Sequence, residues 1–427
     1  MADDRKPKEQ QGLPEGWKWV RFKDYVYFQE GPGLTSDLFE GRSEGIPFLN
    51  IRCIQNNQLL KDKLQFVDEN IVRKHFKHFL LQENDLVVSS SGTLGRTLFI
   101  KKEHLPLLLN TSIIRMRPKN ESLSRFYLKY FIESEFFQKE IYRLSTGSAQ
   151  SNYGPSHLKR IFLILPPLPE QRKIAEILET VDNAIEKTEK IIEKYKRIKQ
   201  GLMQDLLTKG IDEKGNIRSE KTHKFKDSPL GRIPEEWEVV RLGEVVEIYD
   251  NKRIPLSEEE RANRKGIYPY CGANGIIDHI DSYIFEGEYL LLAEDGGFFG
   301  RFENSAYLMS GKFWVNNHAH VLKAREGVSV NGFILAWLIF DDLSRYISGT
   351  TRQKLNQSAM RNILIPLPPL SEQKRIAEIL SQIDQAIEKE EKYKQKLERL
   401  KKGLMEDLLT GKVRVNKLLE GENYETA

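Results

Sequence analysis

The polar side chains of this sequence that could do chemistry lie in loops, and the familiar catalytic motifs do not accompany them. The phosphate-binding loop G-x-x-x-x-G-K-[ST], the dinucleotide fingerprint G-x-G-x-x-G and the zinc-protease motif H-E-x-x-H do not occur. The N-P-P-[FY] and D-P-P-[FY] motifs of adenine methyltransferases are also missing from the sequence. We therefore expect no catalytic residue in this chain and no cofactor of its own.

Metal binding is the next chemistry to consider. Glu294 and Asp295 could form a carboxylate pair at a strand end, but acidic residues before Gly-Gly more often form turns. His318 and His320 alternate as on one strand face and could join Cys271 or His279 on zinc. Because no C-x-x-C pair accompanies them, a structural or DNA-facing role is favoured and no metal site is expected.

Two matching loops carry the chemistry of contact with a nucleic-acid groove. Asn and Gln suit adenine, Arg suits guanine, and Ser, Thr and Lys commonly hold phosphates. The first loop offers small hydroxyls and amides, and the second adds two cations. The candidates for DNA binding in these loops are Ser148, Gln150, Asn152, Thr350, Thr351, Arg352, Gln353, Lys354 and Asn356.

A second polar patch follows an apolar strand in each half of the chain. The strand of NDLVVSSSGTLGR (84 to 96) and that of EYLLLAEDGGFFGR (288 to 301) both lead into a Gly-rich turn. A solvated surface loop is the competing interpretation for any one residue, but the coincidence of position in both halves favours a DNA-binding role for the group. The DNA-binding candidates here are Ser89, Ser90, Ser91, Thr93, Arg96 and Arg301.

The elements that must position these loops are used twice. Each half opens on [LI]-P-E-x-W, ends with an aromatic helix and a polar loop, and closes on a strand that leads into L-P-P-L before a long helix. The resulting division is a recognition domain at 1–169, a helix at 170–208, a linker at 209–232, a second recognition domain at 233–371, a helix at 372–410 and a tail at 411–427.

The two long helices are copies of each other at an offset of 202 residues, and 24 of their 39 positions are identical. Such a helix is about 58 Å long, which is the length of a strut. Apolar residues at heptad spacing predict an antiparallel pair related by a pseudo-twofold axis. The predicted seam consists of Ile174, Ile177, Val181, Ile191, Tyr195, Ile198, Leu202, Ile376, Ile379, Ile383, Tyr393, Leu397, Leu400 and Leu404.

Composition predicts a globular protein whose first half could meet a polyanion. With 427 residues and 39% hydrophobic residues it can build two cores. Residues 1–169 hold 25 basic and 19 acidic side chains, whereas 209–371 hold 21 and 23, so the first half is the more basic. Two cysteines, no apolar signal segment and no run long enough to span a membrane predict a cytoplasmic protein without a membrane partner.

With these motifs, nearly the whole chain resembles the specificity subunits of type I restriction-modification systems. The resemblance rests on the duplicated P-P-L-x-E-Q-[RK]-[KR]-I-A-E-I-L and G-L-M-x-D-L-L-T segments and on the [LI]-P-E-x-W openings. It implies an α+β protein with two α/β target recognition domains, joined by long antiparallel coiled-coil helices.

The resemblance also implies a function and partners. The chain would be a non-catalytic reader of a bipartite, asymmetric target in double-stranded DNA. It would dock two methyltransferase subunits, and the full complex would add ATP-dependent restriction subunits. A coiled-coil scaffold for proteins, without DNA specificity, is the alternative, and an autonomous nuclease or methyltransferase is disfavoured because motifs for it are missing.

Overall fold

The computed structural model describes residues 12–55, 57–145, 152–349 and 353–422. They divide into two compact units, and each unit is described by itself. Unit 1 comprises residues 1–187 and 394–427, and unit 2 comprises residues 188–393. Each unit therefore contains one α/β domain and a part of both long helices, α6 (Leu168–Thr208) and α11 (Leu370–Leu409). No helix of the described residues is long and apolar enough to cross a membrane.

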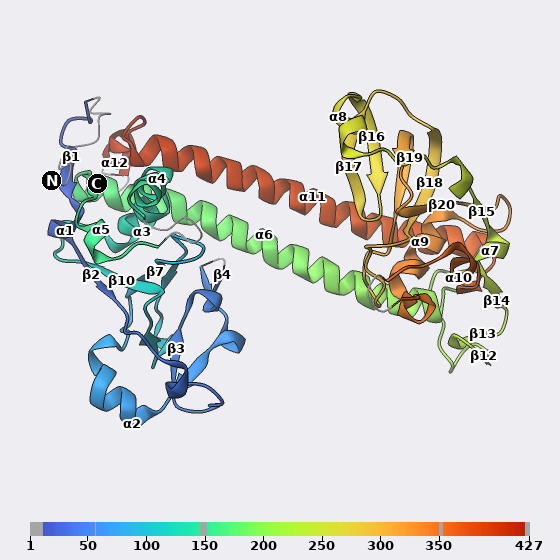
Figure 1. The fold of residues 1–427 in the computed structure, drawn as a ribbon, viewed down its shortest axis with the longest axis horizontal. Helices are drawn as coiled ribbons and strands as arrows, with labels where there is room; N and C mark the ends of the chain where they lie inside the picture. The colour runs from blue at the N-terminus through green and yellow to red at the C-terminus, as the bar shows by residue number, and fades with distance from the viewer. Residues whose placement is uncertain (1–11, 56, 146–151, 350–352, 423–427) are drawn as a thin grey trace. The chain divides into compact units, whose positions relative to one another are not determined.

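The domain of unit 1 is built on a four-stranded antiparallel sheet in the order β2-β10-β7-β8. In Figure 1 the helices α3 and α4 lie on one side of this sheet, toward α6 and α11, and a lobe with α2 and β3 lies on the other side. A small sheet of that lobe has the order β6-β3-β9. The strands are β1 (Lys18–Arg21), β2 (Val26–Glu30), β3 (Ile46–Leu49), β4 (Ile54–Gln55), β5 (Gln58–Leu59), β6 (Gln65–Val67), β7 (Leu86–Ser89), β8 (Thr97–Phe99), β9 (Leu108–Leu109), β10 (Ile113–Pro118) and β11 (Phe162–Leu165).

The single aromatic helix predicted in this domain is interrupted at Ser134. Ser134 has an extended backbone, and its side chain caps α4 by accepting a hydrogen bond from the backbone N–H of Phe137. The chain therefore turns there and forms two helices. The helices of unit 1, besides the parts of α6 and α11, are α1 (Phe22–Tyr25), α2 (Glu69–Ile71), α3 (Arg125–Glu133), α4 (Glu135–Leu144), α5 (Pro155–Leu158) and α12 (Asn416–Glu422).

Unit 2 contains a six-stranded sheet in the order β15-β20-β18-β19-β16-β17. Its first four strands have the arrangement of β2-β10-β7-β8, and the hairpin β16-β17 extends the sheet through a parallel contact of β16 with β19. The strands are β12 (Phe225–Ser228), β13 (Gly231–Pro234), β14 (Glu238–Arg241), β15 (Val246–Ile248), β16 (Lys265–Gly272), β17 (Gly275–Ile280), β18 (Phe285–Ala293), β19 (Ala306–Val315), β20 (Ala319–Ala324) and β21 (Leu364–Leu367). The short helices are α7 (Leu242–Val245), α8 (Glu258–Ala262), α9 (Asn331–Phe340) and α10 (Gln357–Arg361).

Both domains are closed where the chain enters and leaves them. β1 pairs antiparallel with β11, and β14 pairs in the same way with β21. The strand that follows the [LI]-P-E-x-W opening is thus fastened to the strand that precedes the long helix. The segment 209–232, predicted to be a linker, is ordered in unit 2 and includes the first part of the hairpin β12-β13.

The long helices pair antiparallel within each unit. In unit 2, Lys196 of α6 contacts Glu391 of α11, and Lys199 contacts Asp384, so the partner's number falls as the chain of α6 advances. In unit 1, Lys401 contacts Asp182 (Nζ to Oδ1, 2.7 Å). The offset of 202 residues relates the Lys199–Asp384 pair to the Lys401–Asp182 pair, so both ends of the repeat use the same contact.

The apolar seam differs in register from the predicted one. Of the predicted residues, four are buried (Ile174, Val181, Ile376 and Leu397) and six are half-buried (Ile177, Tyr195, Leu202, Ile379, Ile383 and Leu404). Four others are exposed, namely Ile191, Ile198, Tyr393 and Leu400. Next to Ile177, Ile191 and Ile379, the buried side chain is the one that follows, namely Leu178, Ile192 and Leu380.

The sequence explains why Ile191 rather than Ile192 was assigned to the seam. Residues three and four positions apart share a helix face, so either could complete a seam that starts at Ile174. The sequence offers an apolar side chain at both, as in Ile177-Leu178 and Ile191-Ile192. Ile177 packs against the core of the unit 1 domain, and Ile379 packs against that of unit 2. Some of the apolar residues that alternate with the buried seam therefore anchor the domains to the helices.

Candidate nucleic-acid interface and its support

A buried glutamate at the start of each long helix holds three separate segments together. In unit 1, Trp17 Nε1 donates to Glu170 Oε2 (3.3 Å), and Arg414 Nε donates to the same oxygen (3.2 Å). In unit 2, Trp237 Nε1 donates to Glu372 Oε2 (3.2 Å), and Arg218 Nη2 also donates to it (3.1 Å). We call each Trp–Glu–Arg set a clamp, because it joins a domain opening, a helix start and the segment after the other helix.

The glutamine that follows each glutamate completes the clamp. Gln171 Nε2 donates to the carbonyls of Pro166 and Ser122, and Gln373 Nε2 donates to those of Pro368 and Val328. Both side chains are fully buried, and these bonds satisfy their amide N–H groups, which would otherwise be costly to bury. The E-Q pair of the repeated motif is therefore explained as the fastening of each domain to its helix.

The two predicted polar loops of unit 1 lie against each other. Ser91 and Asn152 form an antiparallel bridge, and Tyr153 N donates to Ser90 O (3.0 Å). Ser89 is buried, and its hydroxyl donates to Thr93 O and accepts from Arg96 N. Ser89 and the buried Ser90 thus shape the turn, whereas the side chains of Thr93 and Asn152 are exposed.

The Arg96 side chain forms hydrogen bonds within its own domain. Its Nη1 donates to the backbone oxygen of Ile54 (2.9 Å), and its Nη2 lies 3.5 Å from Thr93 Oγ1. The guanidinium therefore connects the Gly-rich turn to β4 and supports the loop.

The corresponding loops of unit 2 meet in the same way. Asp295 and Lys354 form an antiparallel bridge, and Leu355 N donates to Glu294 O (2.7 Å). Lys354 Nζ lies 2.9 Å from Glu294 Oε1. Asn356 caps α10 by accepting from Ala359 N (2.9 Å), which gives it a structural role. The exposed Gln353 lies directly before this bridge.

A cluster of buried polar side chains holds this loop in place through hydrogen bonds. His320 Nδ1 lies 2.6 Å from Asp250 Oδ2, and its Nε2 lies 2.8 Å from Leu355 O. Arg253 Nη1 donates to Glu294 Oε2 (2.6 Å). Burial alone would raise the pKa of Glu294, but the hydrogen bonds from Lys354 and Arg253 outweigh it, so the pKa lies below its ordinary value.

The histidines considered for zinc each bond to a different carboxylate. His318 Nδ1 pairs with Asp295, and His320 pairs with Asp250. Cys271 is buried, and burial raises the pKa of its thiol to about 11. Among the described residues, no three His, Cys, Asp or Glu side chains gather as a metal site would require.

Arg301 lies against α6 and contacts residues outside the Asp295–Lys354 bridge. Its Nη2 donates to Gln204 Oε1 (2.6 Å), and its guanidinium lies over the rings of Phe302 and Phe340. Five other predicted residues fall outside the described part of the chain: Ser148, Gln150, Thr350, Thr351 and Arg352.

One basic segment was missed by the sequence analysis. After α2 the chain forms one π-helical turn (Val72–Phe76) and a short 3₁₀ helix (Lys77–Phe79). The side chains of Arg73, Lys74, His75, Lys77 and His78 are exposed on these turns. The run R-K-H-F-K-H was a visible signal, because it gathers basic side chains in the more basic half. We call residues 73–78 the basic turn.

Comparison with known proteins agrees with this architecture. A family model described as the type I restriction modification DNA specificity domain matches residues 14–197 and 234–399. A type I restriction enzyme specificity subunit of Methanocaldococcus jannaschii is 29% identical over 448 aligned positions, covering 96% of each chain. A putative type I specificity subunit of Haemophilus influenzae is 40% identical over 146 positions, covering 34% of this chain and 36% of its own.

A solved structure gives the same fold. The crystal structure of a type I restriction-modification S subunit from M. genitalium covers 96% of this chain with a TM-score of 0.60 at 17% identity, and this chain covers 99% of it. The two matched stretches of the family model each combine a domain with most of the long helix that follows it.

Proposed function

The chain belongs to the family of type I restriction-modification DNA specificity subunits, and we propose that it selects the DNA target of such a complex. Each domain reads one half of a bipartite, asymmetric target. The chain itself carries no catalysis. Its partners are double-stranded DNA, two methyltransferase subunits that modify adenine and, in the full complex, the ATP-dependent restriction subunits, and its place is the cytoplasm.

The observation that carries this proposal is a repeated support with unlike reading loops. Both domains use the same four-strand order and the same Trp–Glu–Arg clamp. The paired loops that they present differ, with Ser91 against Asn152 in one and Asp295 against Lys354 in the other. A constant support with variable loops is what two different DNA half-sites require, because base choice depends on the side chains offered to the groove.

The proposal assigns roles to exposed residues of these loops. Asn152 and Gln353 are amides that can bond to base edges, and the basic turn of unit 1 can hold phosphates. The continuous helices α6 and α11 fix the number of unread base pairs between the two half-sites. Ser89, Ser90, Arg96 and Asn356 shape the loops, and Ser91, Thr93, Arg301 and Lys354 remain candidates for contact.

Domain exchange tests the proposal. Residues 13–165 are replaced by the matching domain of a related subunit, and the complex with the methyltransferase subunit is used to select bound sequences from random duplexes. We expect one half-site to change while the other half-site and the spacer stay the same. A single palindromic or continuous site for the native chain, or binding without any sequence preference, would contradict the proposal, and the latter result would favour a protein scaffold.

A further inference from the structure

An arginine of the chain itself covers the surface of α6 in unit 2. The guanidinium carbon of Arg301 lies 4.5 Å from the centre of the Phe340 ring and 5.2 Å from that of Phe302. Its Nη2 donates to Gln204 Oε1 (2.6 Å). The arginine thus joins an aromatic surface of the domain to the polar edge of the helix, a combination to which a planar guanidinium is well suited.

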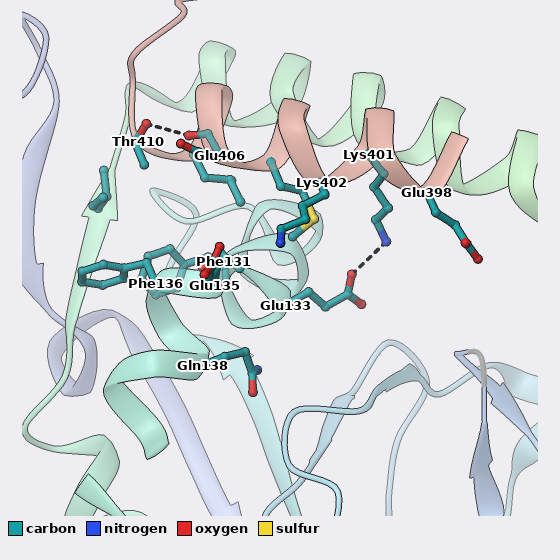
Figure 2. Close-up of a pocket in the computed structure, with 14 residues that line it drawn as sticks. Phe131, Glu133, Glu135, Phe136, Gln138, Glu398, Lys401, Lys402, Glu406 and Thr410 are labelled. Carbon is teal, nitrogen blue, oxygen red and sulfur yellow. Dashed lines mark hydrogen bonds and ion pairs between the residues drawn. The ribbon is translucent and has the colours of Figure 1, made fainter. Parts of the chain in front are cut away.

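The same place in unit 1 is an open groove. The offset of 202 residues makes Glu406 the counterpart of Gln204 and Met405 that of Met203. A groove of about 550 Å³ lies there between α3, α4 and α11 (Figure 2). Arg96, which matches Arg301 at the end of the Gly-rich turn, bonds to Ile54 O instead. The apolar part of the lining consists of Phe131, Phe136, Ile164, Met405 and Leu409.

The groove is more acidic than its counterpart on α6. Glu398 stands where α6 has Lys196, and Glu406 stands where α6 has Gln204. Lys402 in place of Gln200 returns one positive charge, so the three differences together make this face of α11 more negative by two charges. The second lysine of the lining, Lys401, is held by Glu133 and Asp182. Four glutamates and two lysines line the groove, so the groove favours a cation.

We propose that this groove is a docking site for a protein segment that inserts an arginine next to an apolar side chain. The arginine lies over Phe136 and bonds to the carboxylate of Glu406, as Arg301 does with Phe340 and Gln204 in unit 2. Because this inference rests on the proposed function, the partner is the methyltransferase subunit. A guanidinium is weakly hydrated and forms strong hydrogen bonds with a carboxylate, so its transfer from water into the groove costs little free energy.

The test measures the affinity of the purified methyltransferase subunit for the full-length chain by calorimetry. Glu406→Gln restores the uncharged amide of the α6 counterpart, and Phe136→Ala removes the aromatic surface. We expect each change to weaken binding at least about tenfold, because a charge-assisted bond and a stacked ring are removed. The matched control is Glu388→Gln, an exposed glutamate of α11 outside the groove, which should leave the affinity unchanged.

The outcomes separate this inference from the proposed function. If the native chain does not bind the methyltransferase subunit, the proposed function fails and the docking site with it. If the native chain, Glu406→Gln and Phe136→Ala bind equally well, only the docking site is overturned. Sedimentation of the chain alone that shows a dimer lost in Glu406→Gln would assign the groove to a second copy. Loss of the Glu406→Gln effect in a chain without residues 1–11 would assign it to the chain's own terminal segment, and either result would overturn the proposal.

Discussion

The two domains differ most where their common sheet ends. Both contain four antiparallel strands in one order, but unit 1 adds the lobe with β3, β6, β9 and the basic turn, whereas unit 2 extends the sheet by β16 and β17. Near the long helices the two units are alike, with a Trp–Glu–Arg clamp and a Lys–Asp contact between helices. Similarity is therefore concentrated at the support and difference at the parts that would meet a ligand.

The clamp should show the largest effect, and it should differ between the units. In unit 2 the side chains of Glu372 and Arg218 are only 7% and 8% exposed, whereas in unit 1 Arg414 is 30% exposed. Glu372→Ala removes the shared partner of Trp237 Nε1 and of the buried Arg218 guanidinium, which keeps its ion pair with the exposed Glu236 (2.7 Å). The change should cost about 3 kcal/mol of unfolding free energy in unit 2. Glu170→Ala should cost less, because water can reach Arg414.

Peptide-resolved hydrogen exchange tests the clamp prediction, because it reports the protection of each unit separately. The control is Glu378→Ala, an exposed glutamate of α11 that takes no part in the clamp. Equal loss of protection in both units for Glu170→Ala and Glu372→Ala would contradict the importance given to burial.

The seam register gives the second prediction. Ile192 is 7% exposed and Ile191 is 41% exposed, although they are neighbours on α6 in unit 2. Ile192→Asp places an uncompensated charge in the helix pair and should destabilise unit 2 by about 3–4 kcal/mol. Ile191→Asp should cost less than about 1 kcal/mol. Urea unfolding followed by circular dichroism compares them, and a larger effect at Ile191 would restore the register expected from sequence.

This pair of residues also shows how far the sequence could be interpreted. The repeat predicted two domains and two paired helices, since apolar spacing fixes which face of a helix is buried. It could not choose between Ile191 and Ile192, because positions three and four residues away lie on that same face. The apolar residues beside the seam also have a role, because residues such as Ile177 pack against the core of the domain.

The two polar loops of each domain could be located from the sequence, but the roles of their residues could not. The matching loops were found from sequence, and in each unit they form a bridge with the Gly-rich turn. Ser89 and Asn356 have side chains of the expected chemistry, yet the structure uses them to shape the turn and to cap α10. Whether a hydroxyl or amide supports the backbone or faces outward depends on tertiary contacts, which composition does not contain.

The amides of the two loops should separate the two half-sites. Asn152→Ala removes a pair of groups that can bond to a base edge in one half-site and should weaken the preference there by about 1–3 kcal/mol. Gln353→Ala should do the same in the other half-site only. Selection of bound duplexes reports both, with Ser156→Ala, an exposed residue of α5, as the control. Loss of preference at the same base pairs in both variants would contradict the assignment of one half-site to each domain.

The basic turn should affect affinity without affecting base preference. Replacing Lys74 and Lys77 by Ala should lower the slope of log K against log salt by roughly one for each phosphate that the chain no longer neutralises. Lys102, an exposed lysine of the same unit outside the basic turn, provides the control. Because unit 2 has no counterpart of this lobe in its sheet order, the effect should belong to the half-site of unit 1. An unchanged slope would remove the basic turn from the interface.

The smallest expected difference between the units is their response to acid. In unit 2, burial acts to raise the pKa of Asp250, but the hydrogen bond with His320 outweighs it and the pKa is lowered; the pKa of Glu294 is lowered as well. Such carboxylates stabilise the fold above their unfolded pKa, and the stabilisation is lost as the pH falls through the folded value. In unit 1, Asp182 behaves in this way. Burial raises the pKa of Glu30 in unit 1 and of Asp341 in unit 2, and both act in the opposite direction, so the lowered pair Asp250 and Glu294 makes the difference between the units.

Acidification below about pH 4 should therefore loosen unit 2 before unit 1, by about 1 kcal/mol or less for each carboxylate after allowance for solvent screening. Hydrogen exchange at several pH values, corrected for the intrinsic exchange rate, follows each unit. Asp250→Asn should reduce the difference, because the amide does not titrate. The partly buried Asp250 also receives a hydrogen bond from Gln357 on α10, so its protonation should first release protection around 353–361. If unit 1 opens first, or if the loop before α10 keeps its protection while the rest of unit 2 loses it, the His320–Asp250 cluster does not support the reading loop.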